Sequence, residues 1–363
     1  MKVVVDMPDE LVQQVRELIQ QGEHKDAGEF VTMALENQVE LELSGGTSSD
    51  MMTLEQAIGP ETEQTRADGN QAIASSPSSG SYGLNALNRI EYDLVLTVPP
   101  PNLDRLDAGP LWGQYNRIFP VKLTLRVLAN ELRNQAVHAT SQVDGSGKEW
   151  ISLDRFGQET ADIAREYGLK IQQVDRNKSR GQGQRLSAAL PIGDDPTKSK
   201  ERFRSHFIGD TDQQGGLSGA PAHLLFIKIP TNSPGLIGIT ENGLEFASKW
   251  NPLIDGGVSS DQPLSEDEAK YYLQYVQDRI PEEFNAMALT AASIEDGDNR
   301  PKSLTERVAP LNENWSEAQV NTVRSGLVSR MCELRLVERK RVGQRGVAYQ
   351  LTDNGLDFHA NNT

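Results

Sequence analysis

The 363-residue sequence has one cysteine, Cys332, and no apolar run approaching the roughly 18 residues of a membrane-spanning helix. A single cysteine excludes an internal disulfide framework and a cysteine-based zinc site. Met1 and Lys2 lead directly into a patterned strand, without the apolar stretch of a secretory signal. We therefore expect a cytoplasmic protein with no membrane partner.

Residue types arranged for catalysis are also missing. The five histidines lie far apart in the sequence, at spacings that do not suit a metal site. There is no phosphate-binding loop and no dinucleotide glycine motif, and residues 216–219 are too short for the turn that presents a nucleophilic serine. We expect no catalytic residue, no metal and no cofactor, and a protein that is not an enzyme.

Acidic side chains outnumber basic ones, giving a formal net charge of −16, and aromatic residues make up only 6% of the chain. The charge is unevenly distributed. Residues 1–42 carry ten acids and three bases (−7), residues 176–206 eight bases and three acids (+5), and residues 316–351 seven bases and three acids (+4). A chain of this length and low apolar content suits two or three small domains joined by polar linkers.

One eight-residue pattern occurs twice, as Ile-Thr-Glu-Asn-Gly-Leu-Glu-Phe at 239–246 and as Leu-Thr-Asp-Asn-Gly-Leu-Asp-Phe at 351–358. Each copy closes an alternating apolar run and begins a helix at a Thr-acid-Asn-Gly step. Each also follows a second strand-like run across a turn that contains Gly or Pro. A hairpin followed by a helix is how a winged-helix domain ends, so the repeat predicts two such closures in one chain.

The first 42 residues have the pattern of a strand followed by two helices. Val3, Val5 and Met7 share one face of the strand. So short a segment cannot bury its apolar faces alone, and we expect a homodimer formed through these three residues. The layout resembles the ribbon-helix-helix fold of the CopG and Arc type, an obligate dimer whose paired strands enter the DNA major groove. Asp6 would face that groove and the segment is acidic, so its own contact with DNA stays an open question.

Residues 43–108 have the composition of a flexible linker, rich in Ser, Gly, Gln and Asn. One short strand is predicted near 90–98, where three consecutive prolines end it. This linker separates the N-terminal segment from the rest of the chain.

Residues 109–258 are expected to form a central domain that is similar to a winged helix. Helices are predicted at 121–134 and at 153–167, the second ended by Gly168, and a hairpin over 169–190 follows. The tip of this hairpin is basic, and its glycines allow close approach of the backbone. We expect it to contact DNA phosphates through Arg176, Lys178, Arg180 and Arg185.

A second basic stretch, 198–204, is interleaved with Phe203 and followed by Phe207. It could follow a nucleic-acid backbone, or it could form an amphipathic helix whose aromatic residues face a core; the sequence favours neither. Residues 223–239 form an apolar hairpin pattern with a neutral tip, which is typical of a core or an interface. We expect this hairpin to close the central sheet.

Residues 259–363 are expected to form a C-terminal domain. A helical pattern covers 265–294, a short element follows at 304–308, and a helix at 317–334 begins after Ser316, a good N-cap. Two strand-like runs on either side of Gly-Gln-Arg-Gly come next and lead into the second octapeptide.

This last part resembles the winged helix-turn-helix of MarR- and PadR-type regulators, from Leu-Val-Glu-Arg at 336–339 through the tip to Leu-Thr-Asp-Asn-Gly at 351–355. It departs from them at Arg335, where those proteins commonly carry Gly. A left-handed turn there would cost Arg about 1 kcal/mol relative to Gly, unless the turn differs. The resemblance implies that the 317–334 helix reads the major groove and that the wing meets phosphate or minor groove. The residues assigned to DNA in this way are Thr322, Arg324, Ser325, Arg330, Arg339, Lys340, Arg341 and Arg345.

We therefore expect a mainly α fold with little β (α+β), with an N-terminal ribbon-helix-helix, a linker, and central and C-terminal winged-helix domains. The leading hypothesis is a protein that binds double-stranded DNA, a dimeric transcriptional regulator. The alternative is a non-enzymatic adaptor or assembly subunit of a plasmid-maintenance, replication or defence complex, whose winged helices bind protein partners.

Overall fold

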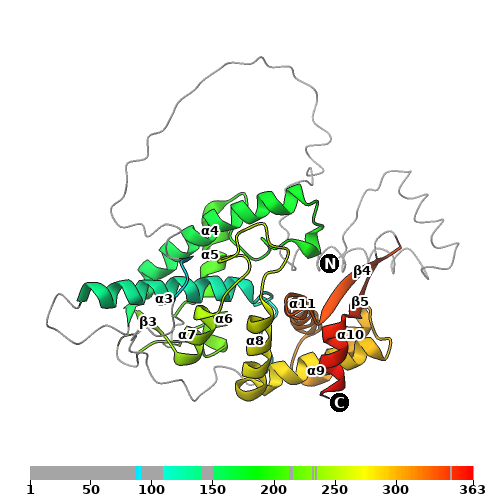
Figure 1. Ribbon diagram of the computed structural model, residues 1–363. Coiled ribbons are helices and arrows are strands. Elements are labelled where there is room, and N and C mark those ends of the chain that lie inside the picture. Colours follow the sequence, from blue (N-terminus) through cyan, green and yellow to red (C-terminus); the bar gives the residue numbers. More distant parts are fainter. Residues whose placement is uncertain are drawn as a thin grey trace, which may run out of the picture.

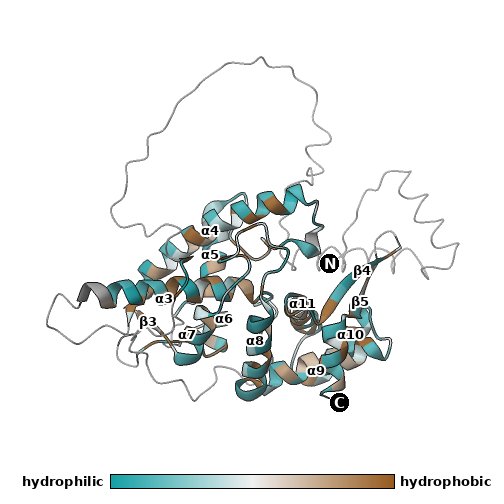
Figure 2. Cartoon of the chain, viewed as in Figure 1, coloured by the Kyte–Doolittle hydropathy of each residue, from teal (hydrophilic) through white to brown (hydrophobic). Residues whose placement is uncertain are grey.

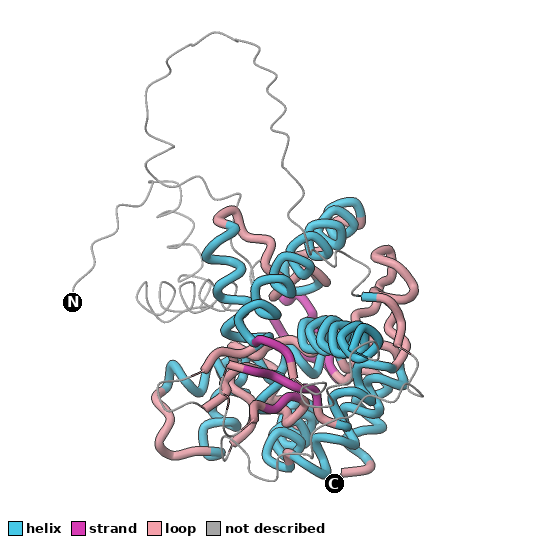
Figure 3. Tube along the Cα trace, turned by 90° about the vertical axis from the view of Figure 1, so that its left-hand side faces the viewer, coloured by secondary structure: helices cyan, strands magenta, loops and turns pink. Residues whose placement is uncertain are grey.

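The computed structural model describes residues 87–90, 109–139, 150–211, 216–230, 233, 235–343 and 346–362. Within these ranges the chain is mainly helical, with short strands in two small antiparallel sheets (Figure 1, Figure 3). The mainly α architecture with little β is thus confirmed. The predicted dimerisation residues Val3, Val5 and Met7 lie outside the described residues, as do most of the linker and Arg345. None of the described helices is long and apolar enough to cross a membrane.

A first unit of the fold begins with two long helices, α3 (Phe119–Ala139) and α4 (Leu153–Asn177), separated by the short strand β1 (Ile151–Ser152). The side chain of Ser152 caps α4 by accepting from the N–H of Arg155 at 3.4 Å. The elements that follow are α5 (Pro196–Phe203), η3 (Arg204–Ile208), α6 (Ala220–His223), β2 (Ile227–Lys228), β3 (Leu236–Ile239) and α7 (Glu241–Ser248). In the sheet, β3 lies between β1 and β2.

A second unit follows after α8 (Glu266–Arg279). Its elements are α9 (Pro281–Glu295), α10 (Pro301–Val308), η4 (Ala309–Leu311), α11 (Glu317–Glu333), β4 (Val337–Val342), β5 (Gly346–Leu351) and α12 (Asp353–Ala360). The β4–β5 hairpin extends away from the helices in Figure 1, and its register runs from Val337 opposite Leu351 to Val342 opposite Gly346. Beside it, the N–H of Tyr349 donates to the carbonyl of Asn299 at 2.8 Å, which places the α9–α10 connection where β1 lies in the first unit.

The octapeptide repeat belongs to a longer structural repeat. In each unit a residue with left-handed backbone lies two positions after the last residue of the helix before the hairpin, Leu225 (φ 56°) in one and Arg335 (φ 58°) in the other. In both cases the next N–H reaches back five residues to a carbonyl of the helix, at 2.9 Å. Helix ends of this kind usually employ glycine. Arg335 therefore adopts the left-handed turn rather than a different one, and the apolar hairpin predicted over 223–239 is confirmed as β2 and β3.

The helix after each hairpin is fixed in the same way in both units. Thr240 and Thr352 cap α7 and α12, where each hydroxyl accepts from a glycine N–H (3.2 and 3.1 Å) and donates to the carbonyl of the left-handed residue. Those glycines, Gly243 and Gly355, pack directly against the backbone of the chain that enters the hairpin. A Cβ there would come within 2.2 and 1.9 Å of a backbone carbonyl oxygen. The repeated Thr-acid-Asn-Gly step thus needs threonine as the cap and glycine for the close contact.

The hairpin predicted over 169–190 is wrong. α4 continues through Gly168 to Asn177, and turns follow it, including the short helix η2 (Gln182–Gln184). Gly168 lies inside the helix, where the absence of a side chain leaves space for residues 190–192. A Cβ there would lie 2.9 Å from Cβ of Leu190 and 2.7 Å from Cγ2 of Ile192, so the glycine allows the returning chain to pack on α4.

Two further predictions are resolved by local structure. The pattern over 265–294 forms two helices, because Pro281 begins α9 and the residue before a proline is forced out of the helical region, here to φ −137°. The basic stretch 198–204 falls mainly in α5, where Phe203 and the following Phe207 are each 2% exposed. The interpretation as an amphipathic helix with its aromatic residues in a core is therefore the one that holds.

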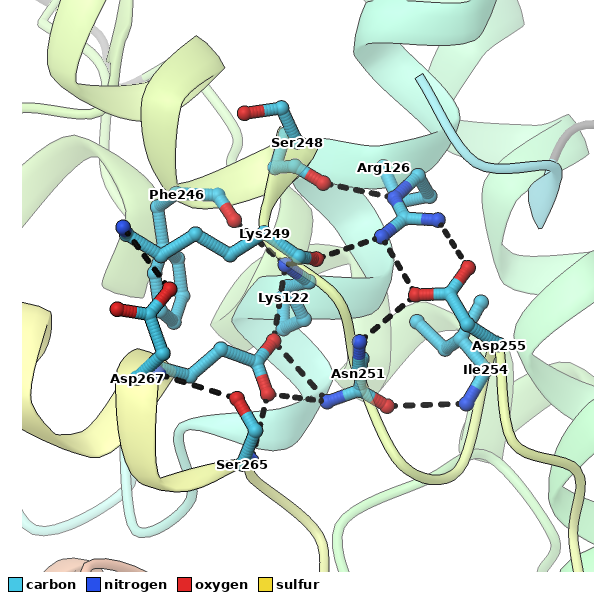
Figure 4. A network of polar contacts seen from close by, with 12 residues as sticks. Lys122, Arg126, Phe246, Ser248, Lys249, Asn251, Ile254, Asp255, Ser265 and Asp267 are labelled. Atoms are coloured by element: carbon cyan, nitrogen blue, oxygen red, sulfur yellow. Dashed lines mark hydrogen bonds and ion pairs between the residues drawn. The ribbon is translucent and has the colours of Figure 1, made fainter. Parts of the chain in front are cut away.

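Two buried cations of α3, Lys122 and Arg126, hold α7 in place (Figure 4). Lys122 Nζ donates to the carbonyls of Phe246 and Lys249 at 2.5 and 2.7 Å. Arg126 donates to those of Ala247 and Lys249 at 2.7 and 2.9 Å. Carbonyls at the C-terminal end of a helix have no partner within it, so these cations satisfy groups that would otherwise be buried without one.

Acids from two later segments neutralise these cations. Glu268 of α8 lies 2.8 Å from Lys122, and both carboxylate oxygens of Asp255 accept from Arg126, at 2.8 and 3.1 Å. Burial is the main reason why the pKa of Lys122 falls to about 8, despite Glu268. Because α8 follows residue 258, these contacts cross the expected boundary between the central and C-terminal domains.

A carboxyl pair links α3 and α4. Glu131 is 7% exposed and shares a hydrogen bond with Glu159. Burial, followed by this hydrogen bond and the charge of Glu159, raises the pKa of Glu131 to about 8. At neutral pH the folded chain therefore holds a proton that an unfolded glutamate, with a pKa of 4.5, has released.

This proton gives a prediction for stability. The folded-state pKa of Glu131 is raised, so its contribution to the free energy of unfolding should be full below about pH 4.5 and be lost as pH rises through about 8. Glu131→Gln, which cannot titrate, should flatten the fall in melting temperature between these values. Thermal denaturation across the range, with Glu166→Gln on the exposed side of α4 as the control, measures the effect. Identical slopes for wild type and Glu131→Gln would contradict the assignment.

The glycine contacts of the repeat give a second prediction. Gly355→Ala and Gly243→Ala should each lower the free energy of unfolding by about 1–3 kcal/mol, because the new methyl group would overlap a backbone oxygen. Gly235→Ala is the matched control, since a Cβ at that position meets nothing within 4 Å. Chemical denaturation measures all three variants, and equal stability of the Gly355 and Gly235 variants would refute the steric requirement.

Candidate nucleic-acid interface

Two of the predicted DNA-binding cations flank a fold-back at the end of α4. Arg176 lies in the last turn of the helix, where positive charge suits the helix dipole, and Arg185 is exposed beyond the turn. Asp175, which is 1% exposed, holds the chain between Arg176 and Arg185 in its folded-back course. Its carboxylate accepts from the N–H groups of Leu186 and Ser187 at 3.2 and 3.0 Å and from the Ser187 hydroxyl at 2.7 Å. The basic stretch is thereby folded back onto the helix end.

The other two cations of this stretch, Lys178 and Arg180, share one acid. A carboxylate oxygen of Asp261 lies 2.6 Å from Lys178 Nζ and 2.5 Å from Arg180 Nη2. The hydrogen bonds from Lys178 and then from Arg180 lower the pKa of Asp261, although its side chain is 73% exposed. An exposed carboxylate therefore occupies the position at which a phosphate oxygen would meet both cations.

Strand β4 presents three more cations at consecutive positions. Because side chains alternate along a strand, Arg339 and Arg341 share one face and Lys340 lies on the other. The Arg339 guanidinium lies 5.9 Å from the ring centroid of Tyr349, whereas Lys340 and Arg341 are exposed, Lys340 beside Glu338 at 3.2 Å. In Figure 2 the strand is hydrophobic beside α11 and hydrophilic farther along.

The structure brings these two basic stretches together, although they lie 156 positions apart (339 minus 183). A Cβ at Gly183 would lie 2.9 Å from Nη1 of Arg339, so the turn after α4 touches the wing-like hairpin. We call residues 176–185 together with Arg339, Lys340 and Arg341 the basic surface. Its cations come from both units of the fold.

α11, the helix predicted to read the major groove, has most of its polar side chains covered. Arg330 is 1% exposed and forms a two-point pair with Glu283 of α9, at 2.7 and 3.0 Å. It also donates to the carbonyls of Tyr115 and Leu111, at 2.8 and 3.3 Å. Glu283 in turn accepts from the N–H of Leu111 at 2.8 Å. This cation is fully committed inside the protein.

The prediction that α11 turns four polar residues toward DNA is therefore wrong for three of them. Arg324 and Ser325 are each 4% exposed and Arg330 is 1% exposed, while Thr322 is half-buried. Arg324 donates to the Thr305 hydroxyl at 3.3 Å. None of these three side chains can meet a nucleic acid in this arrangement.

Residues 109–119 provide part of the cover and lie against the side of α11 that carries Arg330, whereas Arg324 is covered within its own unit by Thr305 and Tyr349. Gly113 and Gly326 meet backbone to backbone, since a Cβ at Gly326 would lie 2.6 Å from the Gly113 Cα. Glu333 of α11 accepts from the N–H groups of Ile118 and Phe119, at 2.5 and 3.1 Å, at the start of α3. Burial raises the pKa of Glu333, and the nearby Arg117 opposes the shift.

The acids that pair with these cations are difficult to identify from the sequence. Glu283 pairs with a cation 47 residues away, and Asp261 with one 81 residues away, so neither pair forms a local pattern. Asp175 lies five residues before Arg180 and is the one acid of the three that proximity could have suggested.

No protein-family model, no curated protein and no solved structure matches this chain. Function is therefore inferred from the charge, burial and geometry of the described residues.

The buried pair of Arg330 and Glu283 gives a stability prediction. Arg330→Met should lower the free energy of unfolding by about 3–5 kcal/mol, because it leaves the carboxylate of Glu283 buried without its cation. Arg330→Met combined with Glu283→Gln should recover part of this loss. Lys170→Ala, which breaks an exposed pair on α4, should cost no more than about 0.5 kcal/mol. Chemical denaturation measures the free energy of unfolding of each variant. Equal losses for Arg330→Met and Lys170→Ala would contradict the buried pairing of Arg330 with Glu283.

Proposed function

We propose that this chain binds double-stranded DNA through the basic surface, mainly by contacts with phosphates. The observation that carries the proposal is the contact between Gly183 and Arg339, which places the basic turn after α4 against a hairpin that carries cations on both of its faces. Phosphate contacts fix position without reading sequence. That mode fits a surface made of Arg and Lys at a helix end, a turn and a hairpin.

The order of elements supports assigning both units as winged helices. Each has a helix, a chain segment that pairs with the second hairpin strand, further helices, a hairpin and a closing helix. In the second unit β4 and β5 would be the wing, with Arg341 and Lys340 exposed on it. Arg345 of the intervening tip belongs to the same proposed wing.

The burial of Arg324, Ser325 and Arg330 limits what such a protein can read. Base-specific contact from α11 would require residues 109–119 to leave the helix and break the buried pair of Arg330 with Glu283. Binding through the basic surface requires no such change. The function that follows is attachment to the duplex, with sequence preference arising from its shape rather than from bases read by α11.

A dimer formed through Val3, Val5 and Met7 would place two basic surfaces on one duplex. Two linked sites raise the apparent affinity when the linker spans them. This arrangement suits a dimeric transcriptional regulator that occupies paired sites, the role proposed for the whole chain.

A second candidate function is that of a non-enzymatic adaptor or assembly subunit whose winged helices bind protein partners. The covered α11 favours it, because the helix expected to read DNA is engaged inside the chain through Arg330 and Glu333. The two functions differ in whether the basic surface meets DNA.

The proposal predicts a change in salt dependence. Replacing Arg185, Lys340 and Arg341 with Ala should weaken binding to random-sequence duplex uniformly, because these exposed cations would lose their phosphates. The slope of log K against log salt should flatten by up to about 2.7, at about 0.9 for each lost contact. Fluorescence anisotropy with the full chain, over a series of salt concentrations, measures both effects.

A matched control removes the same charge elsewhere, by changing Lys170, Lys198 and Lys302 to Ala. This variant should keep the wild-type slope. Asp261→Asn should tighten binding, because it removes the ion pair of Lys178, while Arg180 stays paired with Asp175. Equal slopes for the two triple variants, or no binding by wild type at low salt, would reject DNA binding through this surface and favour the adaptor function.

A further inference from the structure

The basic surface has more cations than the acids that pair with it. Seven cations form this surface, and Asp175, Asp261 and Glu338 pair with three of them. The cations therefore exceed these acids by four (seven minus three). Arg176 and Arg185 are exposed, and neither forms an ion pair within the part of the chain that the structure describes.

Carboxylates from elsewhere in the chain already contact this surface. Asp261, 81 residues beyond Arg180, places one oxygen 2.5 Å from Nη2 of Arg180 and 2.6 Å from Nζ of Lys178. Backbone oxygens of the same segment add to the contact, because the Ser259 carbonyl accepts from Lys178 at 2.7 Å and the Ser260 carbonyl from Arg180 at 3.1 Å. An acidic segment of the chain can thus take the place of a phosphate backbone on these cations.

Most of the acidic excess of the chain lies before the first described residue. Residues 1–86 carry fifteen acids and four bases, a net charge of −11 out of the −16 of the whole chain. Residues 1–42 alone contribute −7. Residues 87–363 therefore carry only −5 (−16 minus −11), so the first part of the chain is the main electrostatic complement of the basic surface.

The first described residues fix the point from which this acidic part must reach. The carbonyl of Asn88 accepts from Nδ2 of Asn130 at 2.8 Å, which holds the start of the described chain on α3. The next residue of α3, Glu131, shares a hydrogen bond with Glu159 of α4. The basic surface begins at Arg176, 17 residues farther along α4 (176 minus 159), which is about 26 Å at 1.5 Å per residue.

The intervening chain is long enough for that distance. Residues 43–86 number 44 (86 minus 42), and a Ser- and Gly-rich chain of this length spans roughly 33–40 Å on average. A tether whose span is comparable to the separation gives an effective concentration of the order of 1 mM. An acidic segment with an intrinsic dissociation constant of about 0.1 mM would then occupy the surface about ten times as often as it leaves it empty.

We propose that residues 1–42 dock on the basic surface of the same chain and compete with DNA for it. The docking depends only on the opposite charges of the two parts, whereas its regulatory consequence rests on the proposed function. Exposed ion pairs are individually weak and are screened by salt, so the docking is reversible and a duplex displaces it. In this arrangement the acidic segment lowers the affinity for DNA and makes no contact with the duplex.

Zero-length cross-linking of the full chain tests the docking without DNA. A carbodiimide joins a carboxylate to a lysine amine where the two are in direct contact. Mass spectrometry should find residues 1–42 joined to Lys178 or Lys340 at low salt, and at least about ten-fold less product at about 1 M salt, where the Debye length falls to about 3 Å. Lys198 is the control lysine, since its side chain is 84% exposed on α5, away from the basic surface. A mixture of isotope-labelled and unlabelled chains should give these products within single chains.

A full-chain variant tests the consequence for DNA. It removes four acids of the segment and lowers its net charge from −7 to −3 (−7 plus 4). The changes are Asp9→Asn, Glu10→Gln, Glu17→Gln and Glu29→Gln. Binding to random-sequence duplex should tighten about ten-fold at low salt, and the gain should vanish at high salt because the docking is already lost there.

A matched control removes the same charge from exposed acids of the described part of the chain. Its changes are Asp194→Asn, Glu201→Gln, Asp278→Asn and Glu295→Gln. This control should alter DNA affinity by less than about two-fold, because charges beyond a Debye length are screened. Circular dichroism confirms that each variant is folded.

The docking is overturned if residues 1–42 form no cross-link with Lys178 or Lys340, or if they reach Lys198 as often. It is also overturned if the products join different chains. Equal DNA affinities of the variant and its control would reject the competition. If the cross-links form while neither wild type nor variant binds a duplex, the docking is supported, and the competition is rejected together with the proposed function.

Discussion

Backbone groups at helix ends have no partner within their own helix, and in this chain buried charges supply those partners across long sequence distances. Lys122 and Arg126 of α3 satisfy the last carbonyls of α7, and Glu333 of α11 satisfies N–H groups at the start of α3. Each of these charges is itself neutralised, so none is buried alone. The N-terminal half of α3 is thereby joined both to α11, at Ile118 and Phe119, and to α7, through Lys122 and Arg126.

This constraint decides which surfaces are available for function. The attachment of α3 to Glu333, together with Arg330 holding the carbonyl of Tyr115, keeps residues 109–119 on α11. The same attachment covers the side of α11 that carries Ser325 and Arg330. The basic surface remains open because it lies at the end of α4 and on β4, away from the buried charge network. One set of polar contacts therefore closes a predicted DNA-reading face and leaves the other candidate surface accessible.

Local physics was sufficient to predict the hairpin-and-helix closures and the Ser316 cap. The Thr-acid-Asn-Gly step specifies a cap, which depends on neighbouring residues, and a close backbone contact with the chain that enters the same hairpin. Gly168 shows where such reasoning fails, because a glycine inside a helical pattern has the same sequence signal whether it ends the helix or accepts a packed chain. Arg330 fails for a different reason: its partner Glu283 is 47 residues away, and a charged residue beside a basic wing has every local mark of a surface position. Burial of a charge depends on contacts between residues that are distant in the sequence, so local sequence patterns cannot predict it.

The net charge of −16 does not by itself oppose contact with a polyanion. At an ionic strength of about 0.1 M, charges beyond roughly 10 Å are largely screened, so the acids of distant surfaces contribute little at a phosphate in contact with Arg341. What matters is the balance within that distance, where Asp175 and Asp261 already take up Arg180 and Lys178, and Glu338 lies beside Lys340. Asp175 is buried and holds the fold of the turn, whereas Asp261 is exposed and can be displaced by a phosphate without loss of packing. If the proposed function holds, affinity for a duplex would be set by competition at the exposed carboxylates beside the basic surface, because the acids of distant surfaces are screened.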